Sequence, residues 1–381
     1  MYISFNRLII NLYLITALLS IYMPIKTIML YALAFFHYYF GLYFFYTIKN
    51  NNYQINIYIL LILTSLIISI FMSGTFGHYA IINIFTIFGI YYLIETDATY
   101  TIDRLILYII LISSINFFIY LLLPPDYISM KVIAGFILNR IQLDFLPLSI
   151  TSLLALLAFI LSENLKSKML MYLLKVMNVI LIIKLGKLSV IATLLIIYIL
   201  AHILKRVYPV INKHFLNIFL KIGYTVLFLT ALLLVIFKAY FDSDILILFT
   251  FRDVIYADFI NYTFNHGSLL YGNGFIANST EISSLSSTNP HNQALGIFFN
   301  LGFFGLIIFL LTFLKVLINT VNRLKLGDDI PFKVFFSLSL LMSMDSYFIL
   351  TVFPLSLLFI MFYLIKLPCS KTPSTYLMKS S

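Results

Sequence analysis

Residues 294–318 read ALGIFFNLGFFGLIIFLLTFLKVLI, and this stretch decides the fold. Its only charged residue is Lys315, and nearly every other residue is apolar. A helix needs roughly 20 such residues to cross about 30 Å of hydrocarbon. The stretch therefore predicts a helix that spans a membrane.

The same pattern recurs along the whole chain and predicts about twelve spans. They are residues 8–25, 27–48, 55–72, 79–94, 105–123, 146–162, 169–183, 188–204, 222–240, 294–318, 332–344 and 347–365. The last two meet at Met344-Asp345-Ser346, where one helix with a polar break is the alternative. We expect an all-α, polytopic integral membrane protein in which residues 1–381 form a single domain.

The composition also indicates lipid as the solvent. Apolar residues make up 62% of the chain and charged residues 10%, whereas a soluble domain has about 25% charged residues. This excludes a soluble enzyme, a nucleic-acid reader and a disordered tail. The single Cys369 excludes an internal disulfide, and no His, Asp and Glu residues cluster at metal-ligand spacing. The run after Arg7 lacks an Ala-x-Ala-like cleavage site, so we expect an uncleaved first span.

The excess of basic residues predicts the orientation. The chain has 24 Lys and Arg against 14 Asp and Glu, a net charge of +10. Most Lys and Arg fall on one side when the N-terminus is placed in the cytoplasm, so both termini are predicted inside. Two long loops then lie outside, Pro124–Phe145 and residues 239–293. The second, between the ninth and tenth spans, is large enough for a small extramembrane substructure.

Two local patterns stand out in that second loop. Thr250–Phe264 has apolar residues at helical spacing, which predicts a helix lying on the membrane surface. These residues are Phe251, Ile255, Phe259 and Tyr262. Tyr271-Gly272-Asn273-Gly274 then predicts a turn.

Asn289-Pro290-His291-Asn292 opens the tenth span. Asn is a favoured N-cap and Pro a favoured first helical residue, which places His291 in the first turn. The positive end of the helix dipole disfavours protonated His there, so we expect a neutral imidazole that can accept a proton. A His that only hydrogen-bonds a loop is the alternative. Further along, Gly302 and Gly305 are interpreted as small residues that let helices pack closely.

Four basic residues at outside boundaries break the charge trend. Arg252 heads the predicted surface helix, Arg140 precedes the sixth span, and Lys184 and Lys187 flank Leu185-Gly186. Each alone can be explained as a snorkelling side chain, and Arg252 as a salt bridge to a carboxylate. Together they indicate an anionic partner such as a lipid-linked phosphate or pyrophosphate, which Arg binds through paired donors and Lys as a point charge.

The carboxylates are informative by their positions. None lies within a predicted span, and only the alternative of one broken helix over residues 332–365 would place Asp345 inside one. Proton-coupled and cation-coupled transporters usually need buried carboxylates, so this distribution argues against ion-coupled transport.

The layout resembles the O-antigen polymerase and O-antigen ligase superfamily of bacterial inner membranes. The matching motifs are Phe251-Arg252, Tyr271-Gly272-Asn273-Gly274 and His291-Asn292-Gln293-Ala294-Leu295, followed by Gly302 and Gly305-Leu306. Weaker matches are Arg140 with Asp144-Phe145-Leu146-Pro147, and Gly186-Lys187, where many members have Ser-Arg.

The resemblance implies a membrane glycosyltransferase with a GT-C-like fold, acting on the periplasmic face of the inner membrane. Its donor would be an oligosaccharide on undecaprenyl pyrophosphate, with no metal, no cofactor and no nucleotide sugar. Candidate partners are membrane lipid and, from the same pathway, a chain-length regulator and a flippase. No nucleic-acid partner is expected.

Within this superfamily, the short chain, its compact outside loops and a composition rich in Ile, Phe, Tyr, Lys and Asn favour an O-antigen polymerase in lipopolysaccharide biosynthesis. The alternatives are an O-antigen ligase that transfers the glycan to lipid A-core, a related capsule or enterobacterial-antigen polymerase, and a transporter of lipid-linked oligosaccharide. The residues expected to carry catalysis are Arg252, His291 and Arg140. Those expected to bind substrate are Lys187, Lys184, Asn292, Gly272 and Gly274.

Overall fold

The structure is a computed structural model, and it describes most of the chain between residues 5 and 344. The described ranges are residues 5–19, 23–49, 57–73, 78–122, 128–133, 136–141, 148–207, 213–230, 232–233, 235, 252–266, 269–274 and 292–344. The predicted span over residues 347–365 and its boundary at Asp345 lie outside them, as do His291 and residues 239–250.

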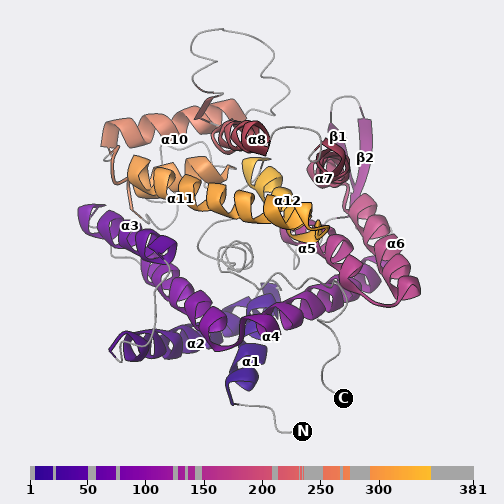
Figure 1. The fold of residues 1–381 in the computed structure, drawn as a ribbon, viewed down its shortest axis with the longest axis horizontal. Helices are drawn as coiled ribbons and strands as arrows, with labels where there is room; N and C mark the ends of the chain where they lie inside the picture. The colour runs from indigo at the N-terminus through magenta and orange to yellow at the C-terminus, as the bar shows by residue number, and fades with distance from the viewer. Residues whose placement is uncertain are drawn as a thin grey trace.

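Within these ranges the chain is helical apart from one hairpin (Figure 1). The helices are α1 (Phe5–Leu19), α2 (Met23–Lys49), α3 (Ile57–Ser73), α4 (His78–Leu122), α5 (Leu148–Leu161), η2 (Ser162–Asn164), α6 (Lys168–Leu185), α7 (Leu188–Val207), α8 (Lys213–Phe228), α10 (Arg252–His266), α11 (Gln293–Lys325) and α12 (Ile330–Met344).

Three of these helices are long and apolar enough to cross a membrane. They are Thr96–Leu122, Leu188–Val207 and Gln293–Lys325. Five shorter apolar helices accompany them in the described chain, within α1, α3, α5, α8 and α12. A helical fold with three helices able to span a membrane is therefore confirmed for the described residues, while the number of about twelve spans and the side on which residues 239–293 lie stay predictions.

Helix α4 covers two predicted spans, residues 79–94 and 105–123. Asp97 interrupts it with a non-helical backbone (φ −164°, ψ 80°), and its carboxylate accepts a hydrogen bond from Tyr100 N at 3.1 Å. Asp97 thus caps a second helix that begins inside the stretch predicted as a loop, because capping allows a helix to start there.

The hairpin departs from the all-α prediction. Strand β1 (Ile128–Ile133) pairs antiparallel with β2 (Phe136–Ile141) inside the loop predicted over Pro124–Phe145. Both strands are rich in Ile and Val, which favour a pleated strand, and two residues separate them.

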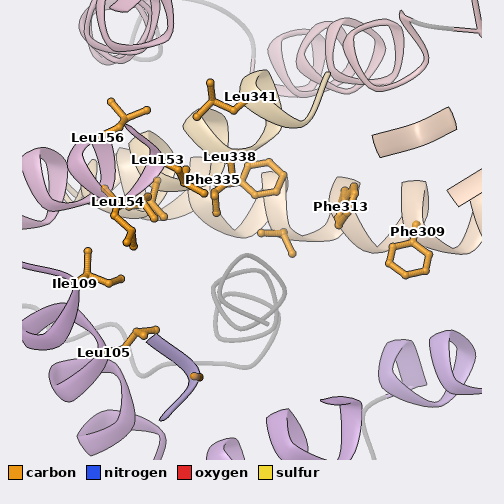
Figure 2. Packing of buried hydrophobic residues seen from close by; sticks show 14 of the residues in the cluster. Leu105, Ile109, Leu153, Leu154, Leu156, Phe309, Phe313, Phe335, Leu338 and Leu341 are labelled. Carbon is orange, nitrogen blue, oxygen red and sulfur yellow. The ribbon is translucent and has the colours of Figure 1, made fainter. Parts of the chain in front are cut away.

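The core is formed by apolar side chains from helices far apart in sequence. Figure 2 shows Leu105 and Ile109 of α4 beside leucines of α5, and Phe313 of α11 near Phe335 of α12. Tyr224 of α8 stacks on Phe335 with ring centroids 5.4 Å apart. Many large aliphatic and aromatic residues of the predicted spans therefore pack against one another, while others stay exposed on the surface of the protein.

Candidate functional site

Helix α10 carries Arg252 as its first residue and lies against the first part of α11 (Figure 1). The ring of Phe259 meets that of Phe299 with centroids 4.9 Å apart. The predicted helix over residues 250–264 is thus confirmed. Its most buried residues are Tyr256, Phe259 and Thr263. The face that packs on protein thus shares Phe259 with the predicted apolar face but is rotated about the helix axis relative to it.

Helix α11 is sharply bent at Gly302, whose φ of 65° and ψ of −165° lie outside the helical range. In a straight helix Gln293 and Phe313 would stand about 30 Å apart. Both instead neighbour Phe228 of α8: Gln293 shares a pocket wall with it, and the Phe313 ring lies 5.3 Å from its ring. Such a bend frees backbone groups on both sides of Gly302.

The predicted turn at residues 271–274 docks onto this bend. Asn273 N donates to Phe299 O at 2.8 Å and Gly274 N to Asn300 O at 3.0 Å. In the reverse direction Phe303 N donates to Leu269 O at 2.8 Å and Phe304 N to Leu270 O at 3.1 Å. The turn therefore satisfies the backbone groups that the bend releases.

Two side chains complete this docking. The buried Asn273 amide donates to Thr263 of α10 and to Phe299 O, each at 3.1 Å. Ser69 of α3 donates to Asn300 O at 2.6 Å. Helices α3 and α10 and the turn are therefore all fastened to the first part of α11.

Asn292 is the N-cap of α11, so the prediction of Asn289 as N-cap with His291 in the first turn is wrong. The Asn292 side chain accepts from Leu295 N at 3.0 Å, and the helix begins at Gln293. Its amide also donates to Ser343 O of α12 at 2.8 Å. The hydrogen bond to α12 thus favours Asn292 over Asn289 as the N-cap of α11.

Three residues expected to bind substrate therefore have internal partners. The Asn292 side chain is fully buried with both its polar atoms engaged, and Gly274 N is bonded to α11. Gly272 lies so close to Asn300 that a Cβ would come within 2.5 Å of its backbone. These contacts give the three residues structural roles, and direct substrate contact stays a prediction.

The other predicted basic residues gather around α6. Lys184 Nζ donates to Tyr120 O at the end of α4 at 3.4 Å, and Lys187 follows the left-handed Gly186 that ends α6. Arg140 lies on β2, opposite Ser129 of β1, and β2 packs against α6.

The predicted site residues thus form two groups. Figure 1 shows the hairpin and α10 on opposite sides of the fold, so the strand of Arg140 is separated from the helix of Arg252. The helix that begins at Arg252 belongs, with Gly272, Gly274 and Asn292, to the group on α11, and Arg140, Lys184 and Lys187 belong to the group near α6.

Sequence reasoning missed an ionic cluster, which we call the Glu163 network. Glu163 in η2 accepts from Lys175 Nζ at 2.7 Å, Lys333 Nζ at 2.6 Å and the Tyr198 hydroxyl at 2.6 Å. Asp329 joins the network through Lys333 at 3.0 Å and Lys205 at 2.8 Å. It connects η2, α6, α7 and α12.

Lys333 is the most buried member, with 7% of its side chain exposed. Its Nζ also lies 4.3 Å from the centre of the Tyr198 ring, a cation–π contact. One signal was available in the sequence: Glu163, Lys205, Asp329 and Lys333 all occur at span ends predicted to lie on the inside. Their pairing required the helices to be placed side by side.

The network lowers the pKa values of its carboxylates. Burial raises the pKa of Glu163, but hydrogen bonds from Lys175, Lys333 and Tyr198 outweigh it and hold the pKa below its usual value. Burial also raises the pKa of Asp329, but hydrogen bonds and charge attraction from Lys205 and Lys333 outweigh it. The pKa of Asp329 is therefore lowered as well. Both carboxylates are therefore charged at neutral pH.

Among the residues that the structure describes, no three His, Cys, Asp or Glu residues come together as metal ligands. Comparison with protein-family models and with curated proteins finds no match. The class that fold and composition define is an α-helical protein with helices able to cross a membrane.

Proposed function

We propose that the protein is a membrane glycosyltransferase that polymerises O-antigen repeat units carried on undecaprenyl pyrophosphate. The observation that carries the proposal is the meeting of three motif segments on α11. The helix that begins at Arg252, the turn at residues 271–274 and Asn292 all contact its first part or the helix packed against it. These segments are separated in sequence, and a catalytic site needs them together.

The chemistry follows from the donor. A hydroxyl of the acceptor sugar attacks the anomeric carbon, and the bond from that carbon to the pyrophosphate oxygen breaks. Charge develops on that oxygen, where a guanidinium from Arg252 or Arg140 would stabilise it. The hydroxyl proton passes to His291 or to the departing pyrophosphate, so His291 would act as base or orient the acceptor.

The basic group near α6 fits the same proposal as a second anion-binding region. Lys184, Lys187 and Arg140 would hold the pyrophosphate of one of the two carrier lipids, because polymerisation needs a donor and an acceptor that are both carrier-linked. The arrangement in two groups supports two separated anionic head groups. The proposal also places the protein in the inner membrane, with its site on the periplasmic side and both termini in the cytoplasm. This orientation follows from the predicted distribution of Lys and Arg.

Disruption of the gene tests the function and separates the alternatives. Lipopolysaccharide from the mutant is expected to show core bearing a single repeat unit on a gel. Bare core would instead indicate a ligase or a transporter and would reject the polymerase. Normal long chains would reject all of these functions. Restoration by the plasmid-borne wild type is the required control.

A further inference from the structure

Arg104 of α4 is a half-buried cation without an acidic partner. It forms no hydrogen bond or ion pair with any residue that the structure describes, the adjacent Asp103 included. Its guanidinium lies 5.0 Å from the centre of the Tyr100 ring, a cation–π contact that leaves the N–H donors in the ring plane of the guanidinium unused. Because the group is half-buried, water serves these donors only in part. Arg104 can therefore bind an anionic group from outside the described chain.

The neighbouring polar groups are already engaged with one another. The guanidinium of Arg7 on α1 donates to the Asp97 carboxylate at 3.0 Å and 3.1 Å. It also lies 4.8 Å from the centre of the Tyr100 ring, whose hydroxyl accepts from Asn11 of α1 at 2.7 Å. These contacts hold α1 against the second helix of α4. They fix the Tyr100 ring on which Arg104 rests, and they leave Arg104 itself unpaired.

The length of the helix places Arg104 at the level of lipid phosphate groups. The apolar helix Thr96–Leu122 has 27 residues and is about 40 Å long, whereas the hydrocarbon of a bilayer is about 30 Å thick. Its uncharged part, Leu105–Leu122, accounts for about 27 Å of that length. Arg104 is therefore the residue at which this helix leaves the hydrocarbon, on the side predicted to be inside.

An exposed apolar stripe runs along α4 from Arg104. Leu107, Leu111, Ile115 and Phe118 are all exposed, and their spacing of three or four residues places them on the helix face of Arg104. From Leu107 to Phe118 the stripe is about 16 Å long. One acyl chain crosses half of the hydrocarbon, about 15 Å. The stripe thus matches the length of an acyl chain whose head group lies at Arg104.

We propose that Arg104 binds the phosphate of an anionic phospholipid, with an acyl chain lying along the exposed stripe of α4. The paired donors of a guanidinium match phosphate oxygens, and basic positions between helices at the cytoplasmic side bind anionic head groups. The unpaired charge of Arg104 selects a head group with a net negative charge. This lipid site goes beyond the proposed function and does not depend on it.

The test measures lipid binding to the purified full-length protein in a neutral detergent, by native mass spectrometry during a titration. The wild type should bind phosphatidylglycerol saturably and more tightly than phosphatidylcholine, whose choline cancels the phosphate charge. Arg104→Gln should bind phosphatidylglycerol at least about tenfold less tightly, because hydrogen bonds to a charged group contribute roughly that factor or more. Equal affinity of the wild type for the two lipids, or unchanged binding by the variant, would overturn the inference.

Arg206→Gln is the matched control. Arg206 is exposed near the end of α7 and is also predicted inside, so this variant loses the same charge from the same side of the membrane. Its affinity for phosphatidylglycerol should stay near that of the wild type. A loss equal to that of Arg104→Gln would indicate general surface charge and reject a site at Arg104.

Arg104→Lys keeps the inference testable if Arg104→Gln does not fold. A lysine retains the charge but has no paired donors, so the affinity should fall below that of the wild type. Wild-type affinity in this variant would contradict binding through a guanidinium.

Glycerol 3-phosphate distinguishes a lipid from a free phosphate. It carries a phosphate without acyl chains, so at equal concentration it should not displace phosphatidylglycerol from the wild type. Displacement would show that the apolar stripe contributes nothing and would reject the lipid. Because none of these measurements uses glycosyl transfer, a failure of the proposed function leaves their outcome unaffected.

Discussion

Gly272 and Gly302 meet backbone to backbone. A Cβ on Gly302 would lie 2.5 Å from Gly272 N, and both glycines have positive φ angles, 75° and 65°. Only glycine combines this conformation with so close an approach. The contact fixes the turn at residues 271–274 against the bend of α11. It therefore holds two motif segments, this turn and the first part of α11, next to each other.

Gly302→Ala should destabilise the protein strongly. The backbone of Gly302, with φ 65° and ψ −165°, lies in a region essentially confined to glycine and costs an alanine about 1–3 kcal/mol, and the overlap with Leu270 and Gly272 adds to this. Thermal unfolding in detergent should show a loss of more than about 2 kcal/mol. Gly223→Ala in α8 is the control, since a Cβ there meets nothing within 4 Å, and a comparable loss in both variants would contradict the account.

Asn292→Ala should remove a helix cap and a link between two helices. The cap alone contributes about 0.5–2 kcal/mol, and the lost bond to Ser343 O leaves a half-buried carbonyl with one partner fewer. Asn292→Asp keeps the acceptor for Leu295 N and should lose less. Unfolding temperatures of both are compared with Asn322→Ala on the exposed surface, which should change little.

Lys333→Met should cost more stability than Lys205→Met. Removing one partner of a buried ion pair leaves the other charge unpaired and costs about 3–5 kcal/mol. Lys205 is 42% exposed, so water can replace its contact with Asp329, and the expected loss is about 0–1 kcal/mol. Equal losses, measured by thermal unfolding in one detergent, would mean that the network does not depend on burial.

Stability should fall in acid through the Glu163 network. The pKa values of Glu163 and Asp329 are lowered on folding, so their contribution is complete above about pH 4.5. It is lost as the pH drops through the folded pKa values. The difference in unfolding temperature between wild type and Glu163→Gln should therefore be largest near pH 7 and shrink below pH 4, and a constant difference would contradict this.

Arg252→Ala should lower polymerisation about 10²–10³-fold while leaving protein levels unchanged, because one transition-state donor is lost. Arg252→Lys should restore only part of the rate, since an ammonium cannot bind in the bidentate manner. The chain-length distribution on a lipopolysaccharide gel and the initial rate in vitro measure this. Arg206→Ala, at an exposed position on α7, is the matched control and should keep full activity.

The helices were largely predictable because lipid imposes a simple rule on sequence. The span predicted at 169–183 corresponds to α6 (Lys168–Leu185), and that at 332–344 to α12. The start of α11 was misjudged at Asn289 because two Asn residues can cap equally well in sequence. Contact with Ser343 decides between them, and that residue lies 51 positions away.

The sequence by itself determined a helical membrane chain and the motifs in its late loop, since apolar runs and short glycine-containing turns are local properties. The tertiary structure decided that Gly302 bends α11 around the turn at residues 271–274, and that Glu163 joins Lys175 and Lys333. It also buried Gln293 at the start of α11. The physical reason is that each of these features depends on side chains and backbone groups that only packing brings within hydrogen-bonding distance.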